Sequence, residues 1–238
     1  MMIAYIVFLH LCLAVLVARP LIRRLQRFRS RSPAASRVYR YEDILRVHQR
    51  IDAAVPEGAV LCFGDSFTAG MCTLALSEKA VNFGIGRDTV DDVRRRLRRY
   101  GSLQRCGGIV LAVGFNDLMS RTPYQVAESY SLLLEELPDD VPVILCGVPP
   151  VDPQRRAKPA NSQIAELNRQ LAELAEREAR LHYILPPEEL MDDAAALRPD
   201  VHEGDGVHLN GRGYAIWTAA ISERLAGPAA APESSRRR

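Results

Sequence analysis

A serine stands where a short apolar run meets a polar turn, in the stretch CFGDSFTAGMC at residues 62–72. The residues before Gly64 have the character of a buried strand, and the chain becomes polar at Asp65 and Ser66. Ser66 either caps a following helix, since serine and aspartate accept hydrogen bonds from free backbone N–H groups, or it is a nucleophile. A nucleophile requires a base, a group that orients the base, and donors for a developing oxyanion.

Three other stretches contain the residue types that this chemistry needs. They are NFGIGRDT at residues 82–89, GFND with Asn116, and DGVHLNGRGY with Asp205 and His208. Together with GDSFTAG, these blocks resemble the SGNH/GDSL hydrolase family, in the family's order, and the resemblance spans about residues 59–225. The second block is most similar to the small acetylhydrolases of the platelet-activating-factor type. The resemblance implies a serine esterase that cleaves acyl or acetyl esters through an acyl-enzyme intermediate, without a metal or organic cofactor.

The base is expected to be His208. A serine hydroxyl is a weak nucleophile at neutral pH, so a base must take its proton during attack, and imidazole is suited to this task. Asp205 stands three residues before His208 and can bond one ring nitrogen, which leaves the other to face Ser66. The resemblance implies this close Asp-x-x-His spacing. His202 is near enough to Asp205 to be a second, weaker candidate for the base.

Three donors are expected around the oxyanion: the backbone N–H of Ser66, a backbone N–H from the turn at Gly86 and Arg87, and the side-chain amide of Asn116. In the family the donor glycine lies just before the Asp-Thr pair, and this chain has Arg87 there, with Gly86 one residue earlier. The backbone N–H survives the exchange, but a non-glycine residue is strained at positive φ, so the shape of the turn stays open. Arg87 could also narrow the pocket or attract an anionic substrate group.

The elements that must position these residues are visible as alternating patterns. Short apolar runs predict buried strands at 59–64, 80–85, 108–114, 141–148 and 181–185, and helical spacing predicts helices at 89–100, 124–137, 162–180 and 212–225. This alternation predicts an α/β fold, a three-layer α/β/α sandwich with a five-stranded parallel sheet, for which the resemblance implies a flavodoxin-like arrangement. Ligands bind beyond the carboxyl ends of such strands, where Ser66, the Gly86 turn and Asn116 all fall.

Several residues near these motifs have structural interpretations. Asp65 is expected to shape its turn and Asp117 to brace Asn116, while Thr89 with Asp92 makes an acidic variant of a helix-start box. The run RRRLRR at residues 94–99 is expected to be a solvated helix face, although a basic helix could also touch anionic lipid headgroups.

Composition and cysteine spacing exclude some classes of protein. With 47% hydrophobic and 25% charged residues the chain is not disordered throughout, and a net charge of +2 argues against a nucleic-acid partner. The five cysteines are odd in number and have no Cys-x-x-Cys spacing, so neither a disulfide framework nor a zinc site is indicated.

The first 18 residues form an apolar run that would span about 27 Å as a helix, close to the thickness of a bilayer's hydrocarbon core. We expect a transmembrane anchor at residues 1–18, with a cleaved signal peptide and a buried helix as alternatives. Arginines cluster directly after the run, and the positive-inside rule then places the catalytic domain in the cytoplasm, the alternative being a periplasmic or secreted domain.

The expected organisation is an anchor at 1–18, a basic juxtamembrane segment and linker at 19–37, a hydrolase-like domain at 38–226 and a disordered tail at 227–238. The expected partners are a small-molecule or lipid acyl ester and, through the anchor, a membrane; the sequence does not indicate an oligomeric state. Two other functions remain open, an O-acyltransferase that uses the same site and a catalytically silent, membrane-tethered binding module.

Overall fold

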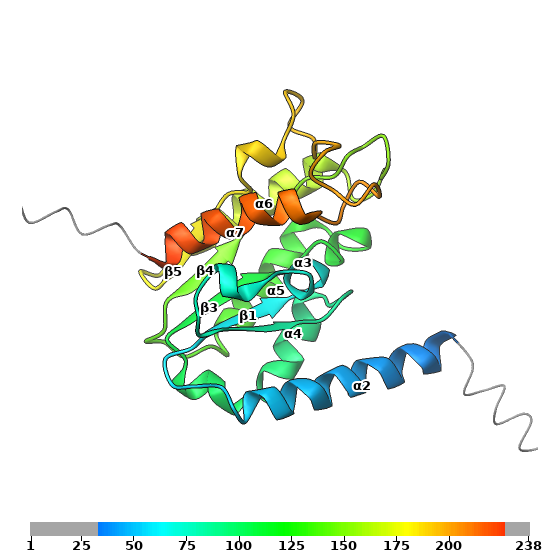
Figure 1. The fold of residues 1–238 in the computed structure, drawn as a ribbon. Helices are drawn as coiled ribbons and strands as arrows, with labels where there is room; N and C mark the ends of the chain where they lie inside the picture. Colours follow the sequence, from blue (N-terminus) through cyan, green and yellow to red (C-terminus); the bar gives the residue numbers. More distant parts are fainter. Residues whose placement is uncertain (1–32, 227–238) are drawn as a thin grey trace, which may run out of the picture. The chain divides into compact units, whose positions relative to one another are not determined.

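The computed structural model describes residues 33–226 (Figure 1). The chain divides into two units, residues 1–48 and 49–238, of which the first is described only in helix α2 (Pro33–Asp52). This helix begins inside the segment that we expected to be a linker, and proline suits its first turn because the N–H there needs no partner. Tyr41, Leu45, His48 and Asp52, spaced by four, three and four residues, lie on the less exposed side of α2, and this spacing was its signal in the sequence.

The predicted membrane anchor at 1–18, the basic segment that follows it and the tail at 227–238 all lie outside the described residues. Across the part that the structure describes, none of the helices has the length and apolar character needed to cross a bilayer.

Five parallel strands form a single sheet, as predicted. The order is β2-β1-β3-β4-β5, with bounds β1 Val60–Gly64, β2 Ala80–Gly84, β3 Gly108–Ala112, β4 Val143–Cys146 and β5 Leu181–Ile184. β3 and β4 end earlier than their apolar runs, because Val113 and Val148 leave the hydrogen-bonded ladder and still pack into the core. The apolar pattern therefore continues into the loops that surround the site.

The longer helices occupy the positions that right-handed crossovers require. α4 (Val90–Leu97), α5 (Pro123–Leu134) and α6 (Asn161–Ala175) connect strands that advance in one direction across the sheet, and each packs against the next. The connection from β1 to β2 runs the opposite way through α3 (Ser66–Ala69) and η1 (Thr73–Ala75), and α7 (Gly211–Leu225) packs beside η1. Short 3₁₀ turns complete the fold at η2 Gly101–Arg105, η3 Asp117–Met119 and η4 Glu188–Leu190.

The strand order creates a crevice at the carboxyl edge of the sheet. From β1 the chain moves to β2 on one side and then to β3 on the other, so the loops after β1 and β3 diverge. Ligands bind at such switch points in parallel sheets. Ser66 follows β1 and Asn116 follows β3, so the topology brings these two residues to the same crevice.

An aromatic cluster packs under this crevice. Phe63 on β1 pairs in register with Phe83 on β2, and their rings lie 5.5 Å apart. The ring of Tyr100, after α4, contacts both phenylalanines at 5.1 and 4.6 Å. All three side chains are buried, and such contacts fix α4 against the ends of β1 and β2.

Candidate active site

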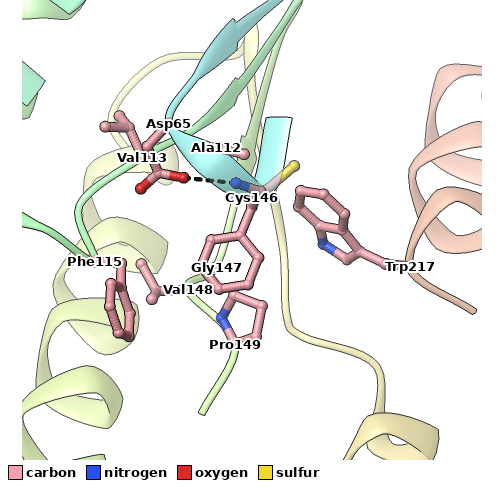
Figure 2. Close-up of a pocket in the computed structure, with 10 residues that line it drawn as sticks. Asp65, Ala112, Val113, Phe115, Cys146, Gly147, Val148, Pro149 and Trp217 are labelled. Carbon is pink, nitrogen blue, oxygen red and sulfur yellow. Dashed lines mark hydrogen bonds between the residues drawn. The ribbon is translucent and has the colours of Figure 1, made fainter. Parts of the chain in front are cut away.

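Ser66 is the first residue of α3 and is separated from β1 only by Asp65. Asp65 caps this helix, because its carboxylate accepts a hydrogen bond from the backbone N–H of Phe67 at 3.0 Å (Figure 2). The prediction that Asp65 shapes the turn is confirmed, and the capping interpretation of the Ser66 hydroxyl does not apply. Instead, Ser66 Oγ lies 3.1 Å from Nε2 of His208.

His208 is held between Ser66 and Asp205. Its Nδ1 lies 2.5 Å from Asp205 Oδ2, and the other carboxylate oxygen accepts hydrogen bonds from the backbone N–H groups of Val207 and His208, each at 2.9 Å. Burial raises the Asp205 pKa, but the bonds from the His208 ring and these two N–H groups outweigh it and lower the pKa to about 2. An ionised Asp205 selects the ring tautomer with the proton on Nδ1, which leaves the Nε2 lone pair facing the hydroxyl.

His202 does not compete for the role of base, in contrast to the alternative raised from the sequence. Its side chain is buried, and Nδ1 accepts hydrogen bonds from the backbone N–H groups of Gly204 at 2.9 Å and Gly206 at 3.3 Å. Nε2 lies 3.4 Å from Asp152 Oδ2, near enough for electrostatic attraction but not aligned as a hydrogen bond. His202 therefore fixes the loop that carries His208.

The turn after β2 lies next to Ser66. A Cβ atom built on Gly86 would be 4.0 Å from the Cβ of Ser66, and the N–H of Asp88 donates to the carbonyl of Ile85 at 3.1 Å to close the turn. Arg87 takes a φ of 74°, so the turn keeps the positive φ of a glycine although the residue is arginine. The backbone N–H groups of Ser66, Gly86 and Arg87 have no hydrogen-bond acceptor among residues 33–226.

Asn116 lies beside this turn, and its amide is already hydrogen-bonded. Its Nδ2 donates to the carbonyl of Asp88 at 3.0 Å and, at a longer 3.4 Å, to Asp65 Oδ2. The amide therefore connects the loop after β3 to the turns after β1 and β2. The long bond to Asp65 is weak, so this second proton is available to another acceptor at low cost.

Asp117 does not brace Asn116 through its side chain, contrary to our expectation. Its carboxylate accepts a bond from the backbone N–H of Val90 at 3.1 Å and pairs with Arg121 at 3.0 Å. It thereby holds the start of α4. Burial raises the Asp117 pKa to about 6, against the lowering effects of the Val90 N–H and of Arg121.

Arg96 holds the turns after β1 and β2 in place from below. Its Nε donates to Asp88 Oδ2 at 2.8 Å, its Nη2 to the carbonyl of Gly64 at 3.2 Å, and its Nη1 to the hydroxyl of Tyr100 at 2.9 Å. Both members of the Arg96–Asp88 pair are only 2% exposed, and the guanidinium lies 5.5 Å from the ring centre of Phe63. One cation thus fixes the backbone before Ser66 and the residue after Arg87.

Sequence reasoning missed Arg96, because the run at 94–99 was expected to be a solvated face. The expectation is correct for Arg95, which pairs with Asp92, and for Arg98, which pairs with Glu136; both are exposed. The signal for Arg96 was its place on the apolar stripe of α4, three residues after Val93 and four before Tyr100.

The carboxyl group of Asp65 is buried, and its environment favours the neutral acid. Its pKa is raised from 3.8 to about 8, chiefly by burial and to a smaller extent by the carboxylates of Asp88 and Asp117, while the bond from the Phe67 N–H acts in the opposite direction. Asp65 also borders a small cavity of about 10 Å³ under the nucleophile turn, whose other walls include Phe67, Phe115, Pro149 and Trp217 (Figure 2). That volume holds about one water molecule.

A larger cavity of about 420 Å³ lies at the other edge of the sheet, near the starts of β1 and β4. Arg224 and His182 meet there at 3.0 Å, and burial together with the charge of Arg224 lowers the His182 pKa. This cavity contains no arrangement comparable to Ser66 and His208 among the described residues, so its size alone does not make it the catalytic site.

Comparison with known proteins agrees with this geometry. A model of the GDSL-like lipase/acylhydrolase family matches residues 62–216, which is more than half of the chain and includes Ser66, Asn116, Asp205 and His208. The chain belongs to the GDSL-like lipase/acylhydrolase family. It is therefore an ester hydrolase of the serine esterase type, and the resemblance found in the sequence is confirmed. A comparison with curated protein sequences gives no significant match.

Solved structures share the fold at low sequence identity. A Streptococcus pneumoniae protein whose name refers to platelet activating factor is 21% identical, with a TM-score of 0.71 over 82% of this chain and 99% of that one. A GDSL-like lipase from Bacteroides thetaiotaomicron is 22% identical, with a TM-score of 0.66 over 76% of this chain and 96% of that one. An acetyl-xylooligosaccharide esterase from Geobacillus stearothermophilus is 18% identical, with a TM-score of 0.57 over 72% and 95%.

Proposed function

We propose that this chain hydrolyses acyl or acetyl esters through an acyl-enzyme formed on Ser66. The supporting observation is the continuous chain of contacts from Ser66 Oγ to His208 Nε2 at 3.1 Å and from His208 Nδ1 to Asp205 at 2.5 Å. Ser66 Oγ attacks the ester carbonyl while Nε2 takes its proton, and Asp205 stabilises the imidazolium that forms. The alcohol leaves with that proton, and a water molecule, deprotonated by His208, then releases the acid and regenerates Ser66.

The oxyanion would be held by donors that are free or weakly engaged in the resting enzyme. The N–H groups of Ser66, Gly86 and Arg87 have no acceptor among residues 33–226, and the Gly86 turn lies next to Ser66. The Asn116 proton that makes the long 3.4 Å bond to Asp65 can turn to the oxyanion when substrate binds. Loss of one such donor typically costs about 2.7–4 kcal/mol of transition-state stabilisation.

The substrate is proposed to have a short acyl group, such as acetyl. The cavity under the nucleophile turn is bordered by Asp65 and Phe67, the neighbours of Ser66, and has only about 10 Å³, so an acyl chain that entered it in this conformation would have to be short. The structural relative from Geobacillus is described as an esterase of acetylated xylo-oligosaccharides, which agrees with a short acyl group. A lipid that carries a short acyl ester fits equally well, since the alcohol part would lie outside this cavity.

Hydrolysis is favoured over acyl transfer by the exposure of the base. The side chains of His208 and Asp205 are both 47% exposed, so water can approach the acyl-enzyme. An acyltransferase must exclude water and bind an acceptor alcohol. A silent binding module is disfavoured because such a module needs no serine at hydrogen-bond distance from a correctly oriented histidine.

The test uses the full-length protein in detergent with 4-nitrophenyl esters of graded acyl length. We expect hydrolysis that is fastest for acetate, and loss of at least about 10³-fold in kcat for Ser66→Ala. Ser77→Ala, at an exposed turn, is the matched control and keeps wild-type activity. A fluorophosphonate probe should label the wild type and not Ser66→Ala; equal activity of Ser66→Ala and wild type would overturn the proposal.

We also propose that residues 1–18 anchor the enzyme in a membrane with the catalytic domain in the cytoplasm. The support is the apolar run of about 27 Å followed by clustered arginines. A reporter fused after Ala226 should behave as cytoplasmic, and the full chain should sediment with membranes after a carbonate wash. Activity of an export-dependent reporter at that position would contradict this topology.

A further inference from the structure

Arg87 occupies a position beside the nucleophile that is costly for its backbone. Its φ of 74° is in the left-handed region, where a side chain is strained and glycine is not. The guanidinium is exposed and has no carboxylate within ion-pair distance among residues 33–226. A strained residue that persists at an active-site turn indicates a use for its side chain, since glycine would provide the same N–H without strain.

A second group of exposed cations lies beside the loops that carry His208 and Asn116. Arg155, Arg156 and Lys158 are exposed, and none of them pairs with a carboxylate in the described part of the chain. The backbone around Arg155 packs against Gly206, two residues before His208, because a Cβ built on Gly206 would come within 2.6 Å of the Arg155 Cβ. Arg156 Nη2 reaches the sulfur of Met119 at 4.0 Å, and Met119 is three residues after Asn116.

Other exposed cations in the described part of the chain, such as Lys79 and Arg177, also lack a carboxylate partner, so what distinguishes Arg87, Arg155 and Arg156 is their position beside the site. On the helices that cover one face of the sheet, arginines are matched with acids, as in the pairs Arg94–Glu136, Arg95–Asp92, Arg121–Asp117 and Arg169–Glu166. Three acids lie in or beside the loop that carries His208: Asp152, 3.4 Å from the His202 ring without a hydrogen bond to it, Asp205, bonded to the His208 ring, and the exposed Glu203.

We propose that Arg87, with Arg155 and Arg156, binds an anionic group of the ester substrate, a carboxylate or a phosphate close to the scissile bond. This inference rests on the proposed esterase function and adds the charge class of its substrate. Guanidinium groups are suited to this role because their planar donors match both carboxylate and phosphate oxygens. The substrate class is therefore a short acyl ester of a negatively charged molecule.

The expected effect is moderate because the cations are exposed. Single exposed ion pairs change an equilibrium or rate about twofold to fivefold, and salt reduces them further. Removal of Arg87 or of the Arg155–Arg156 pair should therefore lower the preference for the anionic substrate by a few-fold each. The preference of the wild type should also shrink when the ionic strength is raised.

The experiment measures kcat/KM of the full-length enzyme for matched pairs of anionic and neutral esters. In the first pair, anionic 4-acetoxybenzoate and neutral 4-acetoxybenzamide, the charge is on the alcohol side of the ester. In the second pair, anionic 4-nitrophenyl hydrogen glutarate and neutral 4-nitrophenyl methyl glutarate, the charge is on the acyl side. Two further anionic esters, soluble 4-acetoxyphenyl phosphate and a 2-acetyl phosphatidate in mixed micelles, distinguish a soluble phosphate ester from a lipid headgroup. The variants are Arg87→Gln and Arg155→Gln/Arg156→Gln, with Arg177→Gln as the control.

Arg177 suits this control because it is an exposed cation just after α6, at the edge of the sheet away from the strand carboxyl ends. We expect a ratio of anionic to neutral kcat/KM above one in at least one pair, which falls in both site variants and is unchanged in Arg177→Gln. This inference is overturned if the wild-type ratio is one or less in every pair, or if the site variants leave the ratio unchanged. In either case, hydrolysis of the neutral esters would still support the esterase proposal. Absence of hydrolysis of every ester overturns both.

Discussion

Replacement of Arg96 by methionine removes the cation that lies between the two turns of the active site and keeps most of the volume of the side chain. Three hydrogen bonds are lost, to Asp88, to the Gly64 carbonyl and to the Tyr100 hydroxyl. The Asp88 carboxylate stays buried at 2% exposure without the guanidinium. Asp88 follows Arg87, and Gly64 precedes Asp65. Both turns that carry the oxyanion donors therefore lose a hydrogen bond that holds their backbone in place.

The cost to stability follows from the burial of the pair. Removing one partner of a buried ion pair costs about 3–5 kcal/mol, because the remaining charge has no compensation. The double variant Arg96→Met/Asp88→Asn removes that charge as well, so it should recover a large part of the loss. The carbonyl of Asp88, which accepts the Asn116 amide, is unchanged in this double variant. Arg95→Met, on the same helix but exposed, should cost less than about 1 kcal/mol.

The assay combines urea unfolding with ester kinetics at a temperature where each variant is folded. A positioning role predicts that the double variant regains stability but keeps a lowered kcat with a nearly unchanged KM, and that it reacts slowly with a fluorophosphonate. A purely structural role predicts that kcat returns together with stability. An Arg96→Met protein that loses less than about 1 kcal/mol and retains full kcat would refute the reasoning.

Three further predictions concern other contacts of the site. Asp205→Asn should lower kcat by up to about 10⁴-fold, because an amide no longer selects the His208 tautomer, with little change in unfolding by urea. His202→Phe should lower the free energy of unfolding by about 1–3 kcal/mol, because the N–H groups of Gly204 and Gly206 lose their acceptor. For Asp65, the native state keeps its proton up to a pKa of about 8 while the unfolded state releases it near 3.8, so the wild type should lose stability as pH rises between these values. Urea titrations across this range should show a flatter slope for Asp65→Asn, and parallel slopes would contradict the assignment.

The fold could be predicted because its signals are local. Five apolar runs and four helical periods each correspond to an observed element, and Thr89 with Asp92 forms the expected capping box at the start of α4. The pairing of residues far apart in the chain was predicted from the four motif blocks and the resemblance that they carry, together with the chemistry that a serine nucleophile requires. Ser66 and His208 are 142 positions apart, and their meeting followed from the need of a serine for a base and from the parallel sheet.

The missed features share one cause, which is that a polar residue's partners are set by tertiary packing. Arg96 has the same sequence neighbourhood as Arg95, yet one is buried against Asp88 and the other is exposed. His202 resembles a candidate base in its loop, and only the fold shows that its ring faces backbone N–H groups. Burial changes the role of such residues. In a single sequence, the only sign of that burial is the position of the residue on the apolar stripe of a helix.

The charges under the active site indicate why these partners are needed. Three acids, Asp65, Asp88 and Asp117, lie buried near the place where an ester oxygen would become negative, and three ionised carboxylates would oppose that charge. Asp88 is balanced by Arg96 and Asp117 by Arg121, whereas Asp65, with its pKa raised to about 8, is neutral at pH 7. Two of the acids are therefore balanced by arginines and the third by a proton, and the backbone N–H groups of the two turns can act on the oxyanion with little competition from a nearby negative charge. The same balance makes Arg96 more than a structural residue, because its loss would restore a buried negative charge directly behind the oxyanion site.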